Sequence, residues 1–346
     1  MKNPKSKQVK QPSLFFSLTW EFLNEYLPNQ VGRSTATVES YRDSLTIFRR
    51  FLSKDRQIPL NKFRFSDCTK DCIFDFRDYL KQSGNKPSTI NVRVAAVRSY
   101  LNYAADKDIA IQSIALSVSK IPPSKQVQEE KETLSEDALA AILAAPPQTK
   151  IGLRNRTILV TLYDSAVRIS ELLSVKLNDI NLSTQYPSIL FHGKGGKERW
   201  VQLTEKAVKH LNQYLQIFHA NSPKDAYLFS TTIKGKVGMM SDGNVQRIIK
   251  QYADIARKTY PSMPPTVYPH MFRRTRATNL YQDGVPIELV SAILGHSSLQ
   301  TTKDHYAKPS LRQIRDAQET VQTPTRGEEP LWIGNEDEMA RMCGIR

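Results

Sequence analysis

Apolar residues recur at helical spacing through the first third of the chain. Two stretches carry the pattern most clearly, with apolar positions three or four residues apart: Val38, Tyr41, Leu45, Phe48 and Leu52, and then Ile90, Val94, Val97 and Leu101. Residues at these steps share one face of an α-helix, so each stretch predicts an amphipathic helix. Ser88 or Thr89, directly after Pro87, is the predicted N-cap of the second helix. We therefore expect a small all-helical domain over residues 13–119.

Helical periodicity resumes near residue 133 and predicts a second domain over residues 133–322. Ser135 is the expected N-cap of its first helix, because Glu136 and Asp137 follow it and suit the positive end of a helix dipole. Gly295 is suited to end the last of the further helices in a left-handed conformation. These further helices are expected at about 204–218, 242–258, 269–282 and 286–294.

One segment of the second domain departs from helical spacing. Strand-forming residues stand on both sides of a glycine-rich turn, in the order Ile189-Leu190-Phe191, His192-Gly193-Lys194-Gly195-Gly196-Lys197, and then Trp200, Val201 and Leu203. This arrangement predicts a β-hairpin. The expected fold class is mainly α, with a small β-sheet or hairpin in the second domain.

Three polar segments flank these domains. Residues 1–12 contain four lysines and little apolar content, which predicts a flexible basic arm. Residues 120–132 contain Pro122 and Pro123 and no apolar periodicity, which predicts a linker. Residues 323–346 form a tail that needs a surface for its apolar side chains, because so short a helix is unstable alone. These side chains are Trp332, Ile333, Met339 and Met342.

The amino-acid composition adds an expectation about the class of molecule that the protein binds. The chain has 346 residues, enough for two domains, and its 49 Lys and Arg against 34 Asp and Glu give a net charge of +15. Such an excess favours a polyanion, and nucleic acid is the first candidate, although a nonspecific basic surface is the alternative. Three cysteines without a matching Cys/His pair predict reduced thiols rather than a zinc site. No apolar run has the length of a membrane span or signal peptide, so we expect a cytoplasmic protein without membrane contact.

Four short motifs follow one another in the second domain: Ala166-Val167-Arg168-Ile169-Ser170-Glu171-Leu172, Gly193-Lys194-Gly195, His270-Met271-Phe272-Arg273, and Leu294-Gly295-His296 followed by Tyr306. Together they resemble the tyrosine recombinase, or phage integrase, family. The resemblance covers about residues 133–309, and the first domain resembles that family's helical core-binding domain. The interval from His296 to Tyr306 is one residue longer than in Xer-type members.

The resemblance implies a role for each matching residue. Arg168 and Arg273 match the two catalytic arginines, and Lys194 matches the lysine of the β-hairpin. His270 and His296 match the two histidines, and Tyr306 matches the nucleophile. Glu171 is the expected partner of Arg168, with an external salt bridge as the alternative. Two other hairpin cations, Lys197 and Arg199, are alternatives to Lys194.

The residue types suit attack on a phosphodiester. Tyrosine has a reference pKa near 10 and is only about 0.1% ionised at pH 7, so it needs a proton acceptor and positive charge nearby. Two guanidiniums match phosphate oxygens, and His270 and Arg273, three residues apart on a helix, project to one face. A lysine on a hairpin suits protonation of a leaving oxygen. Taken singly, each residue is more often a surface ion pair, a turn residue or a half-buried aromatic; their joint order favours the catalytic interpretation.

The resemblance implies a site-specific recombinase that cuts and rejoins DNA through a 3′-phosphotyrosyl intermediate on Tyr306, without metal, cofactor or ATP. It further implies a two-domain clamp on duplex DNA carrying recombination sites, a homotetramer that passes through a Holliday junction, and a C-terminal tail docked in trans. The tail folded in cis, or inert, is the alternative. No small-molecule substrate is expected, and integration or excision of a mobile element is the preferred role. A type IB topoisomerase-like enzyme and a catalytically silent DNA-binding factor are the alternative functions.

Overall fold

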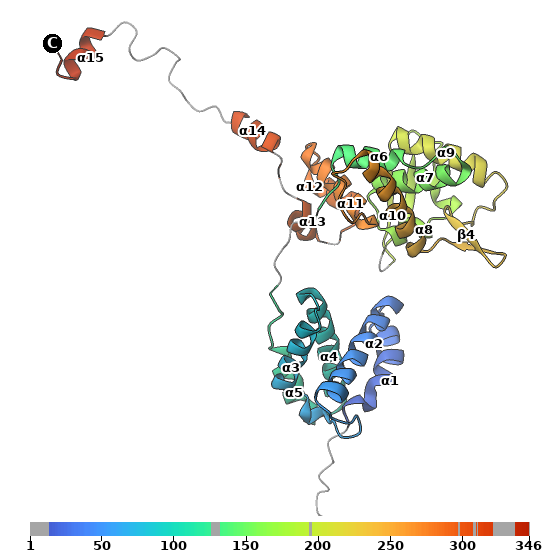
Figure 1. The fold of residues 1–346 in the computed structure, drawn as a ribbon, viewed down its shortest axis with the longest axis vertical. Helices are drawn as coiled ribbons and strands as arrows, with labels where there is room; N and C mark the ends of the chain where they lie inside the picture. The colour runs from blue at the N-terminus through green and yellow to red at the C-terminus, as the bar shows by residue number, and fades with distance from the viewer. Residues whose placement is uncertain are drawn as a thin grey trace, which may run out of the picture. The chain divides into compact units, whose positions relative to one another are not determined.

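The computed structural model describes residues 14–125, 132–193, 196–296, 298–306, 309, 311–320 and 336–345. Several predicted features lie outside the described residues. They are the arm at 1–12, most of the second half of the linker, Lys194, Trp332 and Ile333. The chain divides into two compact units, Met1–Glu130 and Lys131–Arg346 (Figure 1). Mainly helical structure with small antiparallel sheets confirms the expected fold class.

The elements in the described part of the first unit are all helices, joined by short loops. Its elements are η1 (Phe15–Leu18), α1 (Thr19–Glu21), the π-helical η2 (Phe22–Gln30), α2 (Thr35–Arg50), η3 (Phe51–Asp55), η4 (Phe65–Asp67), α3 (Lys70–Gln82), α4 (Pro87–Lys107), η5 (Ile109–Ile111) and α5 (Gln112–Ser119). The two predicted amphipathic helices are confirmed as α2 and α4. The predicted cap of α4 is wrong, since Lys86 is the N-cap and Pro87 is the first helical residue. Proline suits that position because its fixed φ is helical and a first-turn N–H has no helical partner.

Aromatic side chains fill the core of the first unit. The ring of Phe48 lies 5.4 Å from that of Phe15 and 5.0 Å from that of Phe76, measured between centroids. The start of the predicted linker also packs here: Ile121 is buried, and the Ser124 N–H donates to Asn91 Oδ1 at 2.8 Å. This unit therefore gains its stability mainly from apolar burial.

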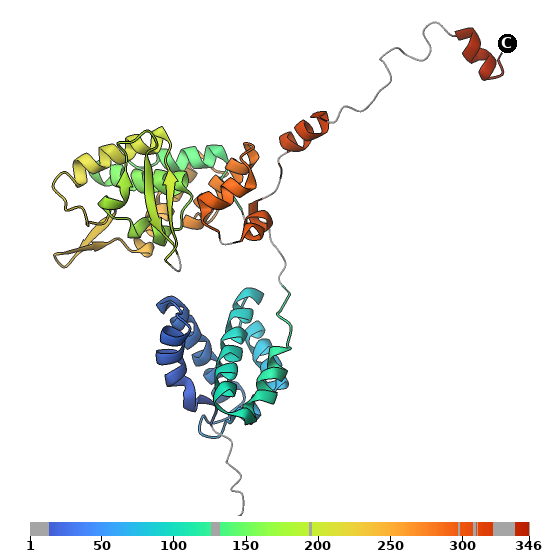
Figure 2. The same ribbon diagram turned by 180° about the vertical axis from the view of Figure 1, so that it is seen from behind.

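The second unit combines helices with two small sheets (Figure 2). Its helices are α6 (Glu136–Ala144), α7 (Lys150–Ser165), α8 (Ile169–Ser174), η6 (Leu177–Asp179), α9 (Glu205–Phe218), α10 (Asp242–Thr259), α11 (Pro269–Gln282), α12 (Ile287–Leu294), α13 (Leu299–Tyr306), α14 (Leu311–Thr320) and α15 (Glu336–Met342). Its strands are β1 (Ile180–Asn181), β2 (Ser188–His192), β3 (Glu198–Gln202), β4 (Ser230–Ile233) and β5 (Lys236–Met239). The sheets run antiparallel in the orders β1-β2-β3 and β4-β5.

Local sequence signals match several of these elements. The Ser135 side chain accepts from the Ala138 N–H and caps α6, and the predicted hairpin is confirmed as β2 and β3, with Phe191 opposite Arg199. Gly295 ends α12 with a φ of 65°. The β4-β5 hairpin was not predicted. Within the described residues, no helix has both the length and the apolar composition that crossing a membrane requires.

Two apolar clusters support the second unit. The larger one holds most of the helices and the first sheet together around residues such as Ile158 and Leu162 of α7. A smaller cluster contains Ala166, Ala277, Val290, Leu294 and Tyr306. This smaller cluster places the predicted nucleophile beside α11 and α12, the helices that carry or precede the other motif residues.

Candidate active site

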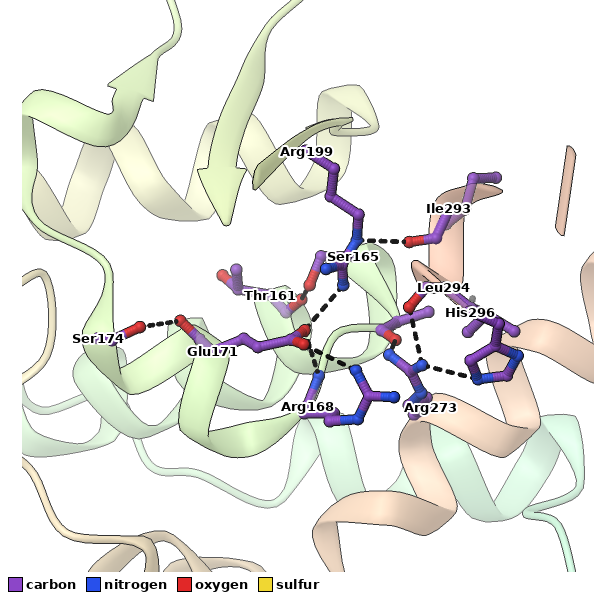
Figure 3. A network of polar contacts seen from close by, with 11 residues as sticks. Thr161, Ser165, Arg168, Glu171, Ser174, Arg199, Arg273, Ile293, Leu294 and His296 are labelled. Atoms are coloured by element: carbon purple, nitrogen blue, oxygen red, sulfur yellow. Dashed lines mark hydrogen bonds and ion pairs between the residues drawn. The ribbon is translucent and has the colours of Figure 1, made fainter. Parts of the chain in front are cut away.

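Arg273 is the most buried charged residue of the site. Its side chain is fully covered, and Nη1 donates to the Ala166 carbonyl at 2.7 Å while Nη2 donates to the Leu294 carbonyl at 2.8 Å (Figure 3). Nη2 also lies 3.0 Å from His296 Nε2. A guanidinium has five N–H donors, and among the described residues Arg273 Nε has no partner. The group is thus held in place with donor capacity left over.

Two helix ends supply the carbonyls that hold Arg273. Ala166 is the C-cap of α7 with a left-handed φ of 50°, and Leu294 is the last residue of α12, directly before Gly295. The C-terminal end of a helix carries partial negative charge on its unpaired carbonyls. Both helix ends therefore stabilise a buried cation. They reach Arg273 because α7 and α12 pack against α11, the helix that carries it.

His296 links Arg273 to the helix that carries Tyr306. An arginine only donates, so His296 Nε2 accepts the hydrogen bond from Arg273 Nη2. In the neutral ring the proton is then on Nδ1, which lies 2.8 Å from Thr302 Oγ1 in α13 and donates to it. The rings of His296 and Tyr306 stack with centroids 6.0 Å apart. Tyr306 itself is only 3% exposed.

A single carboxylate, Glu171, joins two further arginines to this group. Arg168 donates from its backbone N–H to Oε2 at 3.1 Å and from Nη1 to Oε1 at 2.8 Å. Arg199 of β3 donates from Nη2 to Oε2 at 2.7 Å. The expected pairing with Arg168 joins a buried carboxylate to a partly exposed arginine, since the Glu171 side chain is 4% exposed and that of Arg168 is 43% exposed.

These charges perturb one another. Burial lowers the pKa of Arg273 to about 10, and the positive charge of Arg168 lowers it in the same direction. Arg273 is still a cation at pH 7. Burial alone would raise the pKa of Glu171, but the hydrogen bond and charge of Arg199 and the bonds from Arg168 outweigh it and hold that pKa below its usual value. Three guanidiniums around one carboxylate leave an excess of positive charge, which suits an anionic ligand.

Of the two remaining predicted site residues, His270 and Lys194, the structure describes only His270. His270 is the second residue of α11 and is exposed, one turn before Arg273. Lys194 lies outside the described residues, between His192 at the end of β2 and Glu198 at the start of β3. The structure therefore brings Arg168, Arg273, His296 and Tyr306 together, and it places His270 on the helix of Arg273.

Three contacts of this site were not predicted. The Ala166 carbonyl and Thr302 hold Arg273 and His296, and Arg199 shares Glu171 with Arg168. The first two have no local signal, because an alanine and a threonine occur everywhere. Arg199 had a weak signal as a hairpin cation. Among the described residues, no three His, Cys, Asp or Glu side chains gather as metal ligands would.

Comparison with known proteins places the chain in a family. The "Phage integrase family" profile matches residues 132–312, and "Phage integrase SAM-like domain" matches residues 14–118. The tyrosine recombinase XerC of Staphylococcus saprophyticus is 28% identical over 286 residues, covering 81% of this chain and 90% of the relative. XerC of Bacillus pumilus is 29% identical over 301 residues, covering 84% and 92%.

Solved structures share the fold. The XerH site-specific recombinase bound to palindromic difH substrate has a TM-score of 0.67 at 20% identity, covering 83% of this chain and 80% of XerH. The Tn1549 transposon integrase bound to circular intermediate DNA has the same TM-score at 17% identity, covering 90% of this chain and all of the integrase chain. The family profile alone spans more than half of the chain. The chain therefore belongs to the phage integrase family and is a tyrosine recombinase, an enzyme of site-specific DNA recombination.

Proposed function

We propose that this recombinase cuts and rejoins duplex DNA through a 3′-phosphotyrosyl intermediate on Tyr306. The Tyr306 oxygen attacks the phosphorus, the bond from phosphorus to the 5′ oxygen breaks, and the free 5′ hydroxyl of a partner strand later reverses the step. Bond energy is kept in the phosphotyrosine, so ATP is not needed. The observation that carries the proposal is the chain of contacts from Arg273 through His296 to the stacked ring of Tyr306.

Arg168 and Arg273 are proposed to hold the nonbridging phosphate oxygens. Arg273 Nε has no partner among the described residues, and the Arg168 side chain is 43% exposed, so both arginines have donor capacity left for a phosphate. Each arginine contributes about 3 kcal/mol to transition-state stabilisation, by analogy with the loss of one oxyanion-hole donor. Tyr306 and Arg273 are both covered in this state, so a bound phosphate must first displace part of the cover.

Proton transfer is assigned to Lys194 and His270. Lys194 is the proposed general acid that protonates the leaving 5′ oxygen, and His270 is the proposed proton acceptor or hydrogen-bond donor near Tyr306. His296 is proposed to orient Arg273 and the phosphate. Arg199 is a poor alternative to Lys194, because its guanidinium already bonds Glu171 and the Ile293 carbonyl. Lys197 is exposed and remains the alternative hairpin cation.

The proposed partner is duplex DNA with specific recombination sites, held between a core-binding domain at 13–119 and a catalytic domain at 133–322. A homotetramer that exchanges strands through a Holliday junction is proposed, and integration or excision of a mobile element is its proposed role. Similar folds support this: the Tn1549 transposon integrase binds circular intermediate DNA, and lambda integrase forms a tetramer on a Holliday junction at a TM-score of 0.64.

The test is trapping of the covalent adduct. A binding site would first be selected from random duplexes with the Tyr306→Phe variant, and a nicked form of it incubated with each protein before SDS electrophoresis. Wild type should form an SDS-stable adduct and Tyr306→Phe none, with DNA affinity equal within about threefold. Tyr281→Phe, in the same small apolar cluster, is the matched control and should keep the adduct.

Other outcomes favour the other functions. An adduct in Tyr306→Phe would place the nucleophile elsewhere. DNA binding without any wild-type adduct would favour the silent DNA-binding factor. Relaxation of a supercoiled plasmid by a monomer, without exchange between two sites, would favour the topoisomerase-like enzyme.

The tail is proposed to dock on a neighbouring protomer. None of the residues of α15 is buried, Met342 at its end is 83% exposed, and Ile345, three residues beyond the helix, is 64% exposed, so this part of the chain presents apolar side chains to solvent. Deletion of residues 328–346 should leave binding to one DNA site intact and weaken pairing of two sites and strand exchange. Gel shifts with one and two sites would measure this, and full recombination by the truncated protein would rule out docking in trans.

A further inference from the structure

Arg199 is attached at two points outside its own sheet. It stands on β3, its Nη2 donates to Glu171 Oε2 at 2.7 Å, and its Nε donates to the Ile293 carbonyl near the end of α12 at 3.1 Å (Figure 3). Its guanidinium also lies 6.0 Å from the centroid of Phe191, the residue opposite it on β2. The side chain is 16% exposed. A strand residue is thus fastened to α8 and to α12.

Two glycines border this guanidinium, and Gly295 makes the space for it. A Cβ at Gly295 would lie 2.8 Å from Arg199 Cζ, closer than real contacts allow, and the φ of 65° at Gly295 also disfavours a side chain. A Cβ at Gly193 would lie 3.6 Å from both Arg199 Nη1 and Glu171 Oε1. The ion pair is therefore packed between the residue before His296 and the residue before Lys194.

Glu171 connects this attachment to the first arginine. The same carboxylate accepts from Arg168 and from Arg199, and it is almost fully buried. A buried carboxylate is stable only while its partners stay in place. The base of the hairpin, Arg168 and the turn before His296 therefore have linked positions.

We infer that Arg199 is a positioning residue that fastens the β2-β3 hairpin to α8 and α12 and so places Lys194 over the scissile phosphate. This inference rests on the proposed function, in which Lys194 acts on the leaving oxygen. Arg199 does not touch the reacting atoms itself. Its effect passes through the hairpin, because a donor displaced by about 1 Å can lose about 100-fold in rate.

A first measurement tests the attachment without any reaction. Hydrogen exchange of the β2-β3 amides, including Gly193 N–H, which donates to Lys197 O at 2.6 Å, would be compared in wild type and Arg199→Met. We expect exchange at least about threefold faster in the hairpin of the variant, with the rest of the second unit unchanged. Arg257→Met is the matched control, since Arg257 likewise joins a carboxylate, Asp254, and a carbonyl, that of Pro264.

A second measurement tests whether Arg199 acts through Lys194. Single-turnover cleavage would be measured in a double-mutant cycle of Arg199→Met and Lys194→Ala. Arg199→Met alone should cleave about 10- to 100-fold more slowly with DNA affinity within about threefold of wild type. In the Lys194→Ala background the same change should cost less than about twofold. Arg199→Lys, which keeps the charge but not the planar fork, should recover only part of the rate.

The outcomes separate the inference from the proposed function. If wild type forms no covalent adduct, or Lys194→Ala cleaves normally, the proposed function or its general acid fails, and hydrogen exchange still decides the attachment. If hairpin exchange is unchanged, the attachment is refuted. If Arg199→Met slowed cleavage by the same factor in wild type and in the Lys194→Ala background, action through Lys194 would be refuted. If Arg199→Met does not fold, Arg199→Lys carries both measurements, and normal exchange and cleavage by it would refute the inference.

Discussion

The two units of the chain bury different kinds of side chains. In the described part of the first unit the buried residues are apolar or aromatic apart from Ser44. The second unit buries whole charged groups, among them Asp164, Glu171, Arg273 and Arg274. Apolar burial stabilises a fold directly, whereas a buried charge costs several kcal/mol unless it is paired and hydrogen-bonded. Charged side chains are therefore buried in the second unit at a cost in stability, and the exact positions of these groups are what the fold maintains there.

The buried charges of the second unit differ among themselves. Arg274 donates to the Glu132 carbonyl at 2.7 Å and lies 3.3 Å from the Tyr268 hydroxyl, so it ties the start of the unit to α11. Arg273, the next residue, bonds two helix-end carbonyls and His296 and keeps Nε unpartnered among the described residues. The first arrangement is a structural tie, and the second is suited to a ligand.

The largest expected effect tests the aromatic core. Phe48→Ala removes a ring that contacts five others, so the first unit should lose about 4 kcal/mol of unfolding free energy. Urea unfolding should show this loss in the first unit while the second unit unfolds as before. Phe74→Ala, 42% exposed, is the control and should lose less than about 1 kcal/mol. A loss of that small size in Phe48→Ala would contradict the proposed source of stability.

Arg273→Lys and Arg274→Lys sharpen the contrast between neighbouring buried arginines. Arg273→Lys should slow single-turnover cleavage by about 10²- to 10³-fold, because an ammonium cannot reproduce the planar fork of donors. Arg274→Lys should mainly lower the free energy of unfolding, by about 1 to 3 kcal/mol, and leave cleavage within about tenfold of wild type. Equal losses of cleavage in both variants would mean that burial, and not contact with phosphate, explains the effect of Arg273.

The smallest expected effect concerns Glu171 and depends on pH. Glu171→Gln should lower the unfolding free energy by about 2 kcal/mol at pH 7, because both arginines lose their charged partner. The pKa of Glu171 is lowered in the folded state, so its contribution is present above the unfolded value of about 4.3 and is lost as the pH falls through the folded value. The difference from wild type should therefore shrink below about pH 4.

Glu39→Gln provides the control for that pH series. Glu39 is 59% exposed and faces Arg42 at 3.6 Å, so its loss should change stability by less than about 0.5 kcal/mol at any pH. Urea unfolding of wild type and both variants between pH 7 and pH 3 would measure the difference. A Glu171→Gln effect that is constant over this range would contradict the pairing as its cause.

The sequence by itself determined the local elements and the order of the motifs. Helices α2, α10 and α11, the β2-β3 hairpin and the cap at Ser135 follow from spacing, turn residues and capping chemistry, which act over a few positions. The family also follows from motif order. These signals were sufficient because each depends on near neighbours in the chain.

Only the tertiary structure decided which groups meet in the site. The Ala166 carbonyl that holds Arg273 lies 107 positions away in the chain, and Arg199 reaches the Ile293 carbonyl over 94. Thr302 and Ala166 have no sequence signal, and the choice of Arg199 over Lys197 as the partner of Glu171 depends on which hairpin side chain faces α8. Such contacts arise from the packing of α7, α8, α11 and α12, because local spacing orients a side chain on its own element but does not select its distant partner.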